Sequence, residues 1–346
     1  MASYKHIAFT ICSNNYLGQA LALKKSFVKH NPDMGLFIVL VDKLSVAIDY
    51  TVCEPATLLP IAEVEGIHLE DLISRYYIIE LNTAVKPSVF KQLQKQHPEC
   101  ERMYYLDPDL YFYKGLEELH KRLETKCAVL TPHILSPIPR DGKQPDENTF
   151  LQFGIYNLGF LGVNTSHPET SKLLDWWEER TLRFGYDWAH KGYFVDQLWM
   201  TIAPLFFNEI AIENSYGYNM APWNLHERSI VSRDGDTIVL NDDSELVFYH
   251  FSKVTLGEVA ISREFNRYHL QDFPLLKDLY TEYYAALEAS NFSGFRSIPI
   301  AYSIQKSPVA KKALPKKKQQ THYNLVSRVL IKMAKVLDGW VKKSDL

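Results

Sequence analysis

The run Tyr104-Tyr105-Leu106-Asp107-Pro108-Asp109-Leu110-Tyr111-Phe112 places two carboxylates, one residue apart, inside an otherwise aromatic and aliphatic stretch. Side chains two positions apart in an extended chain point to the same side, and Pro108 biases Asp107 toward extended geometry. Asp107 and Asp109 are therefore expected to project together near the end of a buried strand. Two carboxylates this close repel each other unless a positive charge lies between them, and a hard divalent cation is the natural occupant. The alternative is a surface turn, although the apolar flanks argue against a solvated one.

Short apolar runs alternate with helical patterns on both sides of this motif, which predicts an α/β fold with a mixed, mainly parallel sheet flanked by helices. The expected strands are His6–Ile11, Leu36–Val41, Met103–Leu106, Cys127–Leu130, Phe153–Asn164 and Glu245–Phe251. Helices are expected over Leu69–Gln96, with an interruption near Lys86-Pro87, and over Phe194–Ile202. Ligands of such sheets bind beyond the carboxyl ends of the strands. Ile11–Asn14, Asp42 and the Asp107/Asp109 pair fall at such ends, so the binding site is expected there.

Charge divides the chain into two parts. Its 346 residues, 46% of them hydrophobic, suit a globular protein of one large domain or two ordinary ones. Residues 303–346 hold 11 Lys/Arg and 2 Asp/Glu, a local charge of +9, whereas the remainder carries −12. We expect a domain over residues 1–302, then a basic linker and an amphipathic helix at Asn324–Lys343. A basic helix with Trp340 on its apolar face is typical of a membrane interface, and docking on the acidic body or a partner chain is the alternative.

Cysteine use and hydropathy bear on the compartment. The four cysteines are widely spaced, form no CxxC pair and are expected to be reduced and mostly buried, as in a cytosol. No signal segment precedes the first strand pattern, and the longest apolar runs are too short to span a bilayer. The sequence thus predicts a cytoplasmic protein that contacts the inner face of the membrane peripherally through its C-terminal helix.

Further motifs accompany the two aspartates in a definite order. They are the strand and turn Phe9–Tyr16, then Ala84-Val85-Lys86-Pro87, the Asp-x-Asp pair, Tyr156–Asn164, Asp196-Gln197, and His250 within Phe248–Lys253. By this order and spacing the chain resembles the GT-A fold glycosyltransferases, most closely the retaining family that includes bacterial lipopolysaccharide galactosyltransferases and glycogenin. The resemblance implies a Rossmann-like GT-A sheet, a nucleotide-sugar donor and a bound Mn²⁺ or Mg²⁺ ion.

The resemblance also implies roles for individual residues. Asp107, Asp109 and His250 would bind the metal ion, while Asp196 and Gln197 would lie beside the reacting sugar carbon. The residues expected to contact the donor are Thr10, Ile11, Cys12, Asn14, Asp42, Lys86, Asp107, Asn157, Gly159 and Lys253.

Some of these residues have plain structural alternatives. Asp42 would then be a strand-end cap, Lys86 a helical surface lysine, and Asp196 a charge at a helix N-terminus. The chain also departs from the family pattern, because the relatives' His-x-x-Gly-x-x-Lys-Pro-Trp segment is not intact. His250 is followed by Phe-Ser-Lys, so only Lys253 would stand in for the basic contact to the diphosphate.

The segment Asn214–Arg228 is polar and aromatic at once, which makes it the candidate for acceptor binding. Trp223 would stack on an acceptor sugar, with Asn224, His226 and Arg228 supplying hydrogen bonds. The alternative is a buried tryptophan with a solvated Glu–Arg pair.

The predicted function is a metal-dependent hexosyltransferase that moves a sugar from a nucleotide sugar, by resemblance a UDP-hexose, to a cell-envelope glycan or lipid-linked acceptor. The resemblance favours retention, but the residues alone do not decide it, since Asp196 would be the general base in an inverting enzyme. A sugar-nucleotide nucleotidyltransferase is one alternative, although Cys12-Ser13-Asn14-Asn15 replaces the glycine-rich basic loop of that class. The other is a non-catalytic nucleotide-binding or nucleic-acid-binding protein, and the acidic body argues against nucleic acid.

Overall fold

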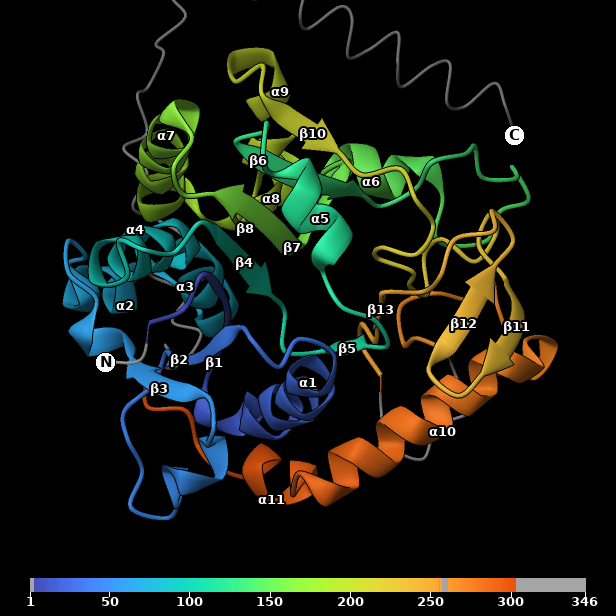
Figure 1. Cartoon of the computed structure of the whole chain (residues 1–346), viewed down its shortest axis with the longest axis horizontal. Coiled ribbons are helices and arrows are strands. Elements are labelled where there is room, and N and C mark those ends of the chain that lie inside the picture. The colour runs from blue at the N-terminus through green and yellow to red at the C-terminus, as the bar shows by residue number, and fades with distance from the viewer. Residues whose placement is uncertain (1–2, 255, 257–260, 303–346) are drawn as a thin grey trace, which may run out of the picture. The chain divides into compact units, whose positions relative to one another are not determined.

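Seven strands of the described chain form one mixed sheet, in the order β10-β6-β7-β4-β1-β2-β3 (Figure 1). The computed structural model describes residues 3–254, 256 and 261–302, which lie in one compact unit. The strands are β1 (His6–Cys12), β2 (Gly35–Leu40), β3 (Thr57–Pro60), β4 (Arg102–Leu106), β6 (Ala128–Pro132), β7 (Tyr156–Asn164) and β10 (Ile210–Ile212). Within this sheet β7 runs antiparallel to β4 and β6, and the other pairs are parallel. The predicted α/β fold with a mixed, mainly parallel sheet is confirmed.

Helices lie between most of these strands. They are α1 (Leu17–His30), α2 (Leu69–Arg75), α3 (Ile78–Ala84), α4 (Lys86–Gln96), α5 (Glu117–Arg122), α6 (Glu147–Phe153), α7 (Pro168–Phe184), α8 (Gln197–Met200), α9 (Ala203–Phe206), α10 (Pro274–Ala289) and α11 (Phe292–Arg296). The short 3-10 segments are η1 (Asn14–Tyr16), η2 (Tyr50–Cys53), η3 (Ile61–Glu63), η4 (Ala189–Lys191) and η5 (Leu270–Asp272). The interruption expected near Lys86 is the start of α4, where Pro87 needs no helical N–H partner.

Helices cover both faces of the sheet. Ile7, Phe9 and Ile11 of β1 join a core cluster with residues of α3, α4 and α7, whereas Ala8 and Cys12 face the opposite cluster with α1. Successive strand residues point to opposite faces, so a strand covered on both sides must be apolar throughout. This explains the continuous hydrophobic runs from which the central strands were predicted.

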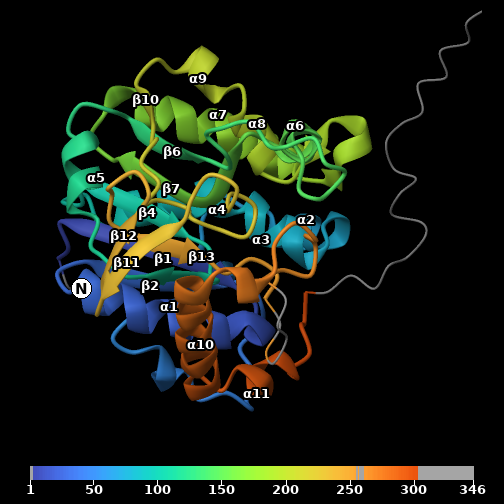
Figure 2. The same ribbon diagram turned by 90° about the vertical axis from the view of Figure 1, so that its right-hand side faces the viewer.

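Three two-stranded ribbons accompany this sheet in the part of the chain that the structure describes. They are β5 (Leu110–Phe112) with β13 (Phe248–His250), β8 (Asp187–Trp188) with β9 (Tyr193–Phe194), and the hairpin β11 (Ile230–Asp234) with β12 (Thr237–Leu240). Figure 2 shows the hairpin on the same side of the sheet as α10, which packs against both α1 and β11. The sequence pattern suggested a helix over Phe194–Ile202; instead Phe194 belongs to β9 and the helix begins only at Gln197.

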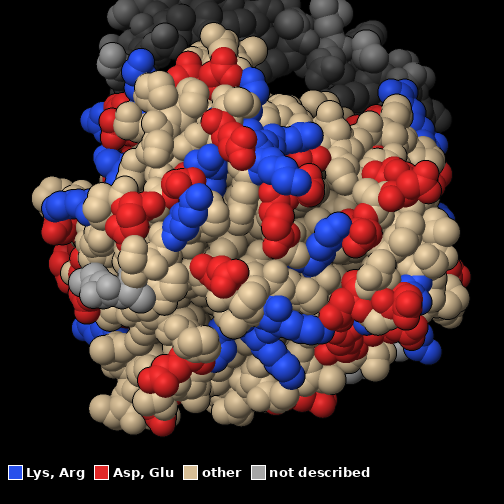
Figure 3. Space-filling view, in the orientation of Figure 1, with Lys and Arg blue, Asp and Glu red and all other residues tan. Residues whose placement is uncertain are grey.

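The remaining expectations concern surface and compartment. Acidic and basic side chains are interspersed on the face shown in Figure 3, with no single basic area across it. All four cysteines, Cys12, Cys53, Cys100 and Cys127, are buried and unpaired, as expected. Among the described helices, none has the length and hydropathy needed to cross a membrane. The predicted linker and the helix at Asn324–Lys343 lie outside the described residues, so the boundary after residue 302 stays a prediction.

Candidate active site

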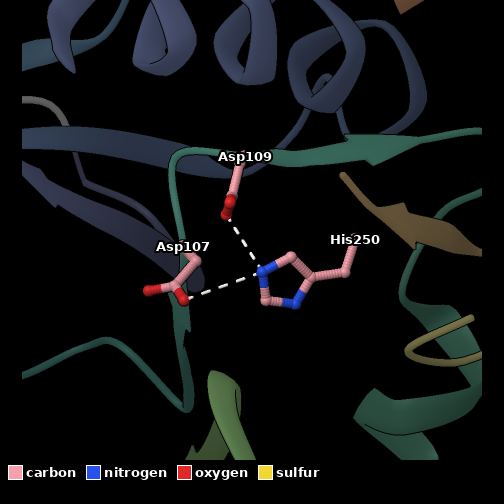
Figure 4. A group of neighbouring side chains, drawn as sticks. All are labelled: Asp107, Asp109 and His250. Atoms are coloured by element: carbon pink, nitrogen blue, oxygen red, sulfur yellow. Dashed lines mark ion pairs between the residues drawn. The ribbon is translucent and has the colours of Figure 1, made fainter. Parts of the chain in front are cut away.

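Asp107, Asp109 and His250 converge on one point at the carboxyl end of β4 (Figure 4). His250 Nε2 lies 3.0 Å from Asp109 Oδ1 and 3.9 Å from Asp107 Oδ2. The two aspartates occupy the turn between β4 and β5, and the pairing of β5 with β13 places His250 opposite Leu110. Residues about 140 positions apart in the chain therefore form one cluster, as the resemblance implied.

The charged groups of this cluster shift one another's pKa values. Burial alone would lower the pKa of His250, but the carboxylates of Asp109 and Asp107 raise it above its usual value. Burial would likewise raise the pKa of Asp109, and the neighbouring imidazole lowers it below the ordinary range. Asp107 accepts a short hydrogen bond from the Tyr105 hydroxyl. The imidazole and the carboxylate of Asp109 thus each favour the charged form of the other.

The ligand atoms of Asp107, Asp109 and His250 suit a divalent ion. Oxygen ligands about 2.1 Å from Mg²⁺ are about 3 Å apart when adjacent and about 4.2 Å apart when opposite. The three ligand atoms lie within 4.8 Å of one another, so small side-chain shifts suffice to bring them around one ion. Two carboxylates with one imidazole suit Mn²⁺ better than a site made only of oxygen atoms would.

A buried ion pair borders the cluster. Lys86 Nζ lies 2.9 Å from Asp196 Oδ2, 4.0 Å from Asp107 Oδ1 and 4.1 Å from the centre of the Tyr105 ring, and it donates to the Leu158 carbonyl at 2.9 Å. Lys86 and Asp196 are only 2% and 1% exposed. Burial raises the pKa of Asp196, and the ammonium of Lys86 opposes this shift. The surface-lysine alternative is therefore wrong: Lys86 balances the charge of a buried carboxylate.

The backbone is strained immediately before Asp196. Val195 has a φ of +40°, a left-handed conformation that β-branched residues rarely adopt. Such a residue costs about 1–3 kcal/mol and persists only where its surroundings hold it. The Val195 N–H donates to the Tyr186 carbonyl at 3.0 Å, and its side chain is buried. This turn aims Asp196 inward, toward Lys86.

Asn157 and Gly159 lie on β7 directly beside the cluster. Asn157 Oδ1 accepts from the Gly159 N–H at 3.1 Å, and its Nδ2 faces His133 Nε2 at 3.3 Å. A Cβ on Gly159 would come within 2.6 Å of His250 Cε1, 2.7 Å of Asp107 Oδ2 and 2.8 Å of Asn157 Oδ1. Any side chain at position 159 would therefore push the cluster apart.

Gln197 is held by backbone groups on both sides of its amide. Its Oε1 accepts from the Leu158 N–H at 3.1 Å, and its Nε2 donates to the Phe153 carbonyl at 2.9 Å. The Leu158 carbonyl accepts from Lys86, which pairs with Asp196, so the predicted residues Gln197, Asp196 and Lys86 meet around one residue of β7.

The residues expected at the nucleotide come together at the ends of β1 and β2. Thr10, Ile11, Cys12 and Asn14 are all buried, and the Val41 N–H donates to the Cys12 carbonyl at 2.8 Å. This join brings the end of β2 alongside the turn that follows β1.

Asp42 caps the end of β2, which is one of the two roles that the sequence left undecided. Its carboxylate accepts from the N–H groups of Asn14 at 3.3 Å, Lys43 at 2.9 Å and Ala301 at 2.8 Å. The contact with Ala301 crosses 259 positions and joins the last described residues to this end of the sheet. The sequence carried no sign of that contact.

Two of the four residues proposed to bind the acceptor sugar instead use their polar atoms in hydrogen bonds within the fold. Asn224 donates to the carbonyls of His133 and Asn219, and its Oδ1 accepts from the Ala221 N–H. Arg228 is buried, donates to the Tyr218 carbonyl at 2.6 Å, and pairs with its chain neighbour at 3.2 Å. The Glu–Arg pair is thus buried rather than solvated, because backbone groups satisfy its polar atoms.

Trp223 is buried, as the alternative expected, whereas Lys253, a predicted donor contact, lies at the surface. The Trp223 ring stands edge-on to the His250 ring, with 5.1 Å between centroids, so it supports a member of the cluster. His226 Nε2 is 3.1 Å from the Ser136 carbonyl. Lys253 is half exposed and pairs with Glu264 at 3.2 Å.

Comparison of the whole chain with known proteins gives two relatives and no family. No protein-family model matches. The chain is 28% identical over 274 residues to YfnF of Bacillus subtilis (strain 168), a match covering 79% of this chain and 89% of that protein. It is 25% identical over 285 residues to YfnD of the same organism, covering 79% and 86%. Both relatives are described as uncharacterized proteins.

Similar solved structures are glycosyltransferases. The galactosyltransferase LgtC in complex with donor and acceptor sugar analogues matches 85% of this chain and 97% of its own, with a TM-score of 0.44 and 16% identity. The glycosyltransferase GlyE of Streptococcus pneumoniae TIGR4 matches 86% and 66%, with a TM-score of 0.46 and 13% identity. Mouse xyloside xylosyltransferase 1 matches 72% and 98%, with a TM-score of 0.43 and 14% identity. The sequence motifs resemble the same class of enzyme.

Proposed function

We propose that this protein is a metal-dependent glycosyltransferase that moves a hexose from a nucleotide sugar, a UDP-hexose by resemblance, to a cell-envelope glycan or lipid-linked acceptor. The observation that carries the proposal is the convergence of Asp107, Asp109 and His250 beside Gly159, where three ligand atoms meet next to a position with no room for a side chain. These three residues would hold a divalent ion, which would supply positive charge to offset the negative charge that develops on the diphosphate as the glycosidic bond breaks.

The arrangement of the other predicted residues supports this assignment. The ends of β1 and β2 would hold the nucleotide, with Asn157 and Gly159 beneath the donor sugar. Asp196 would stabilise the positive charge that develops on the anomeric carbon. Because Asp196 is buried and ion-paired with Lys86, it suits electrostatic stabilisation better than proton abstraction, which supports the retention implied by the resemblance.

The acceptor and location are further parts of the proposal. Trp223 remains the candidate to contact the acceptor sugar, since Asn224 and Arg228 use their polar atoms in hydrogen bonds within the fold. The basic segment after residue 302 would attract the protein to anionic lipid on the cytoplasmic face, near a lipid-linked acceptor.

Release of nucleoside diphosphate from a panel of UDP-, GDP- and dTDP-sugars, with Mn²⁺ and with EDTA, tests the proposal. Release from one donor is expected with Mn²⁺ and not with EDTA, and it is expected to fall at least about 100-fold in Asp109→Asn. Asp236→Asn is the matched control, because Asp236 pairs with Lys29 at the surface and should leave release unchanged. Release that EDTA and Asp109→Asn leave intact would contradict the metal role. If no donor reacts, a calorimetric titration with UDP and Mn²⁺ decides, since a site that binds neither overturns the proposal.

A further inference from the structure

His133, which the motifs did not single out, is fixed in the wall of the site. It directly follows β6, and its ring lies between those of Phe150 and Trp223, with centroid distances of 5.1 and 5.3 Å. Its main chain is also held, because its N–H donates to the Ile155 carbonyl at 2.9 Å and its carbonyl accepts from Asn224 at 3.0 Å. The imidazole therefore has little freedom to turn away from its neighbours.

The contact between His133 and Asn157 has a definite direction. An amide oxygen only accepts hydrogen bonds and an amide nitrogen only donates them. Asn157 Oδ1 accepts from the Gly159 N–H at 3.1 Å, so Nδ2 is the atom that faces His133 Nε2 at 3.3 Å. The ring nitrogen must then be the acceptor, without a proton of its own. Turning the amide over would set its N–H groups against the Gly159 N–H, a buried mismatch that costs about 1–3 kcal/mol.

Burial keeps the His133 ring uncharged. It lowers the pKa of His133 to about 3, so the imidazole is neutral at physiological pH and one of its two nitrogens is an acceptor. Asn157 is buried on the same strand as Gly159, whose missing side chain leaves the amide beside Asp107 and His250. Within the described residues, His133 is the protein group that faces Nδ2, which leaves the second Nδ2 hydrogen without a protein acceptor.

We propose that His133 is a positioning residue for the donor sugar. By accepting one Nδ2 hydrogen of Asn157, it fixes the carboxamide so that the second Nδ2 hydrogen is presented to a hydroxyl group of the sugar. The ligand class is a neutral hydroxylated sugar attached to a nucleoside diphosphate, so the inference rests on the proposed function and adds a residue to it. The nucleotide itself would be held at the ends of β1 and β2 and would not need His133.

Because His133 would affect only the sugar, its role is tested by measuring sugar binding and nucleotide binding separately. Dissociation constants are measured by calorimetry with Mn²⁺ for UDP, UDP-glucose and UDP-galactose, and for GDP and GDP-mannose. The quantity compared is the ratio of the constant for the free diphosphate to that for its sugar. In His133→Phe, which keeps an aromatic ring but loses the acceptor, this ratio is expected to fall about five- to tenfold while the affinity for free diphosphate stays unchanged.

Two further variants make the result specific. His133→Gln places an acceptor oxygen near the position of Nε2 and is expected to restore the wild-type ratio. His120→Phe makes the same chemical change at a partly buried histidine on α5 and is expected to leave the ratio unchanged. Histidine-selective ¹⁵N spectra of the wild-type protein provide a measurement that does not depend on a folded variant. They are expected to show the Nε2 atom of His133 without a proton.

The outcomes distinguish the two proposals. Wild-type protein that binds no nucleotide or nucleotide sugar would overturn the proposed function and this inference with it. Wild-type protein that favours a nucleotide sugar over its diphosphate, with the same ratio in His133→Phe, would overturn the inference alone. Equal weakening of diphosphate and sugar binding in His133→Phe would also overturn it, as would a protonated Nε2 in the spectra.

Discussion

Replacing Lys86 by methionine tests whether the buried ion pair is needed for the fold. The substitution keeps an unbranched side chain of similar length but removes the charge 2.9 Å from Asp196 Oδ2. Leaving one partner of a buried ion pair without compensation costs about 3–5 kcal/mol. Asp196 is 1% exposed, so water cannot take the place of the ammonium. We expect Lys86→Met to lose about 3–5 kcal/mol in the free energy of unfolding, roughly 6–15 °C in Tm.

The pH dependence of this loss has a definite sign. Burial already raises the pKa of Asp196, and without Lys86 it rises further above the unfolded value. A folded pKa above the unfolded value means that the folded state binds more protons, so stability falls as pH rises. The deficit of Lys86→Met should therefore be small below about pH 4, the unfolded pKa of an aspartate, and grow toward neutral pH.

Urea unfolding of a double-mutant cycle measures the effect. Lys86→Met/Asp196→Asn removes both charges and should recover at least half of the loss, because no buried charge is left unpaired. Lys91→Met is the matched control on the same helix: Lys91 pairs with Asp175 and Glu178 but is 40% exposed, so less than about 1 kcal/mol is expected. A loss below about 1 kcal/mol in Lys86→Met, or a double variant no more stable than the single one, would refute the reasoning.

Three further predictions concern the cluster and a distant histidine. Gly159→Ala should weaken Mn²⁺ binding and donor turnover at least about 100-fold, since its Cβ would lie 2.6 Å from His250 Cε1. Mn²⁺ should quench tryptophan fluorescence, and Trp223→Phe should remove most of that signal, because this ring is 5.1 Å from the His250 ring. Between pH 7 and pH 5, the free energy of unfolding should fall by about 1–2 kcal/mol less in His120→Gln than in the wild-type protein, as measured by urea unfolding.

Each of these predictions has an outcome that would contradict it, and the first also has a matched control. Gly162→Ala also crowds a buried position, at 2.8 Å from Tyr104, so it should destabilise the fold yet leave Mn²⁺ affinity unchanged; equal metal affinities in the two alanine variants would contradict the first. Unchanged quenching in Trp223→Phe would contradict the second. Burial lowers the pKa of His120 to about 4, so the stabilisation is complete above about pH 6.5 and is lost as pH falls toward 4. A pH profile identical to wild type in His120→Gln would contradict the third.

Local patterns predicted the parts of the site that depend on local geometry. The spacing of Asp107 and Asp109 at the end of an apolar strand was enough to place both carboxylates on one side of the chain. Asn224 and Arg228 show where local patterns fail, since their polarity suggested solvent or ligand contact. Both are buried, because backbone groups satisfy their hydrogen bonds: Asn224 donates to His133, 91 positions away, and Arg228 donates to Tyr218 within the same segment.

His133 and Ala301 mark the functional features that the motifs missed. His133 lies three positions after the predicted strand Cys127–Leu130, and its place beyond the carboxyl end of a strand was the available signal. Ala301 had none, because its contact with Asp42 is made by a backbone N–H, which every residue except proline carries.

The sequence by itself determined the alternation of strands and helices and the positions of carboxylates at strand ends. These follow from hydrophobic periodicity and chain geometry, which act over a few residues. The tertiary structure decided that His250 joins the aspartates through β13 and β5, that Lys86 neutralises Asp196, and that His133 faces Asn157. Each is a pairing of buried or partly buried polar groups, and its partner is set by which distant segments pack together rather than by any local pattern.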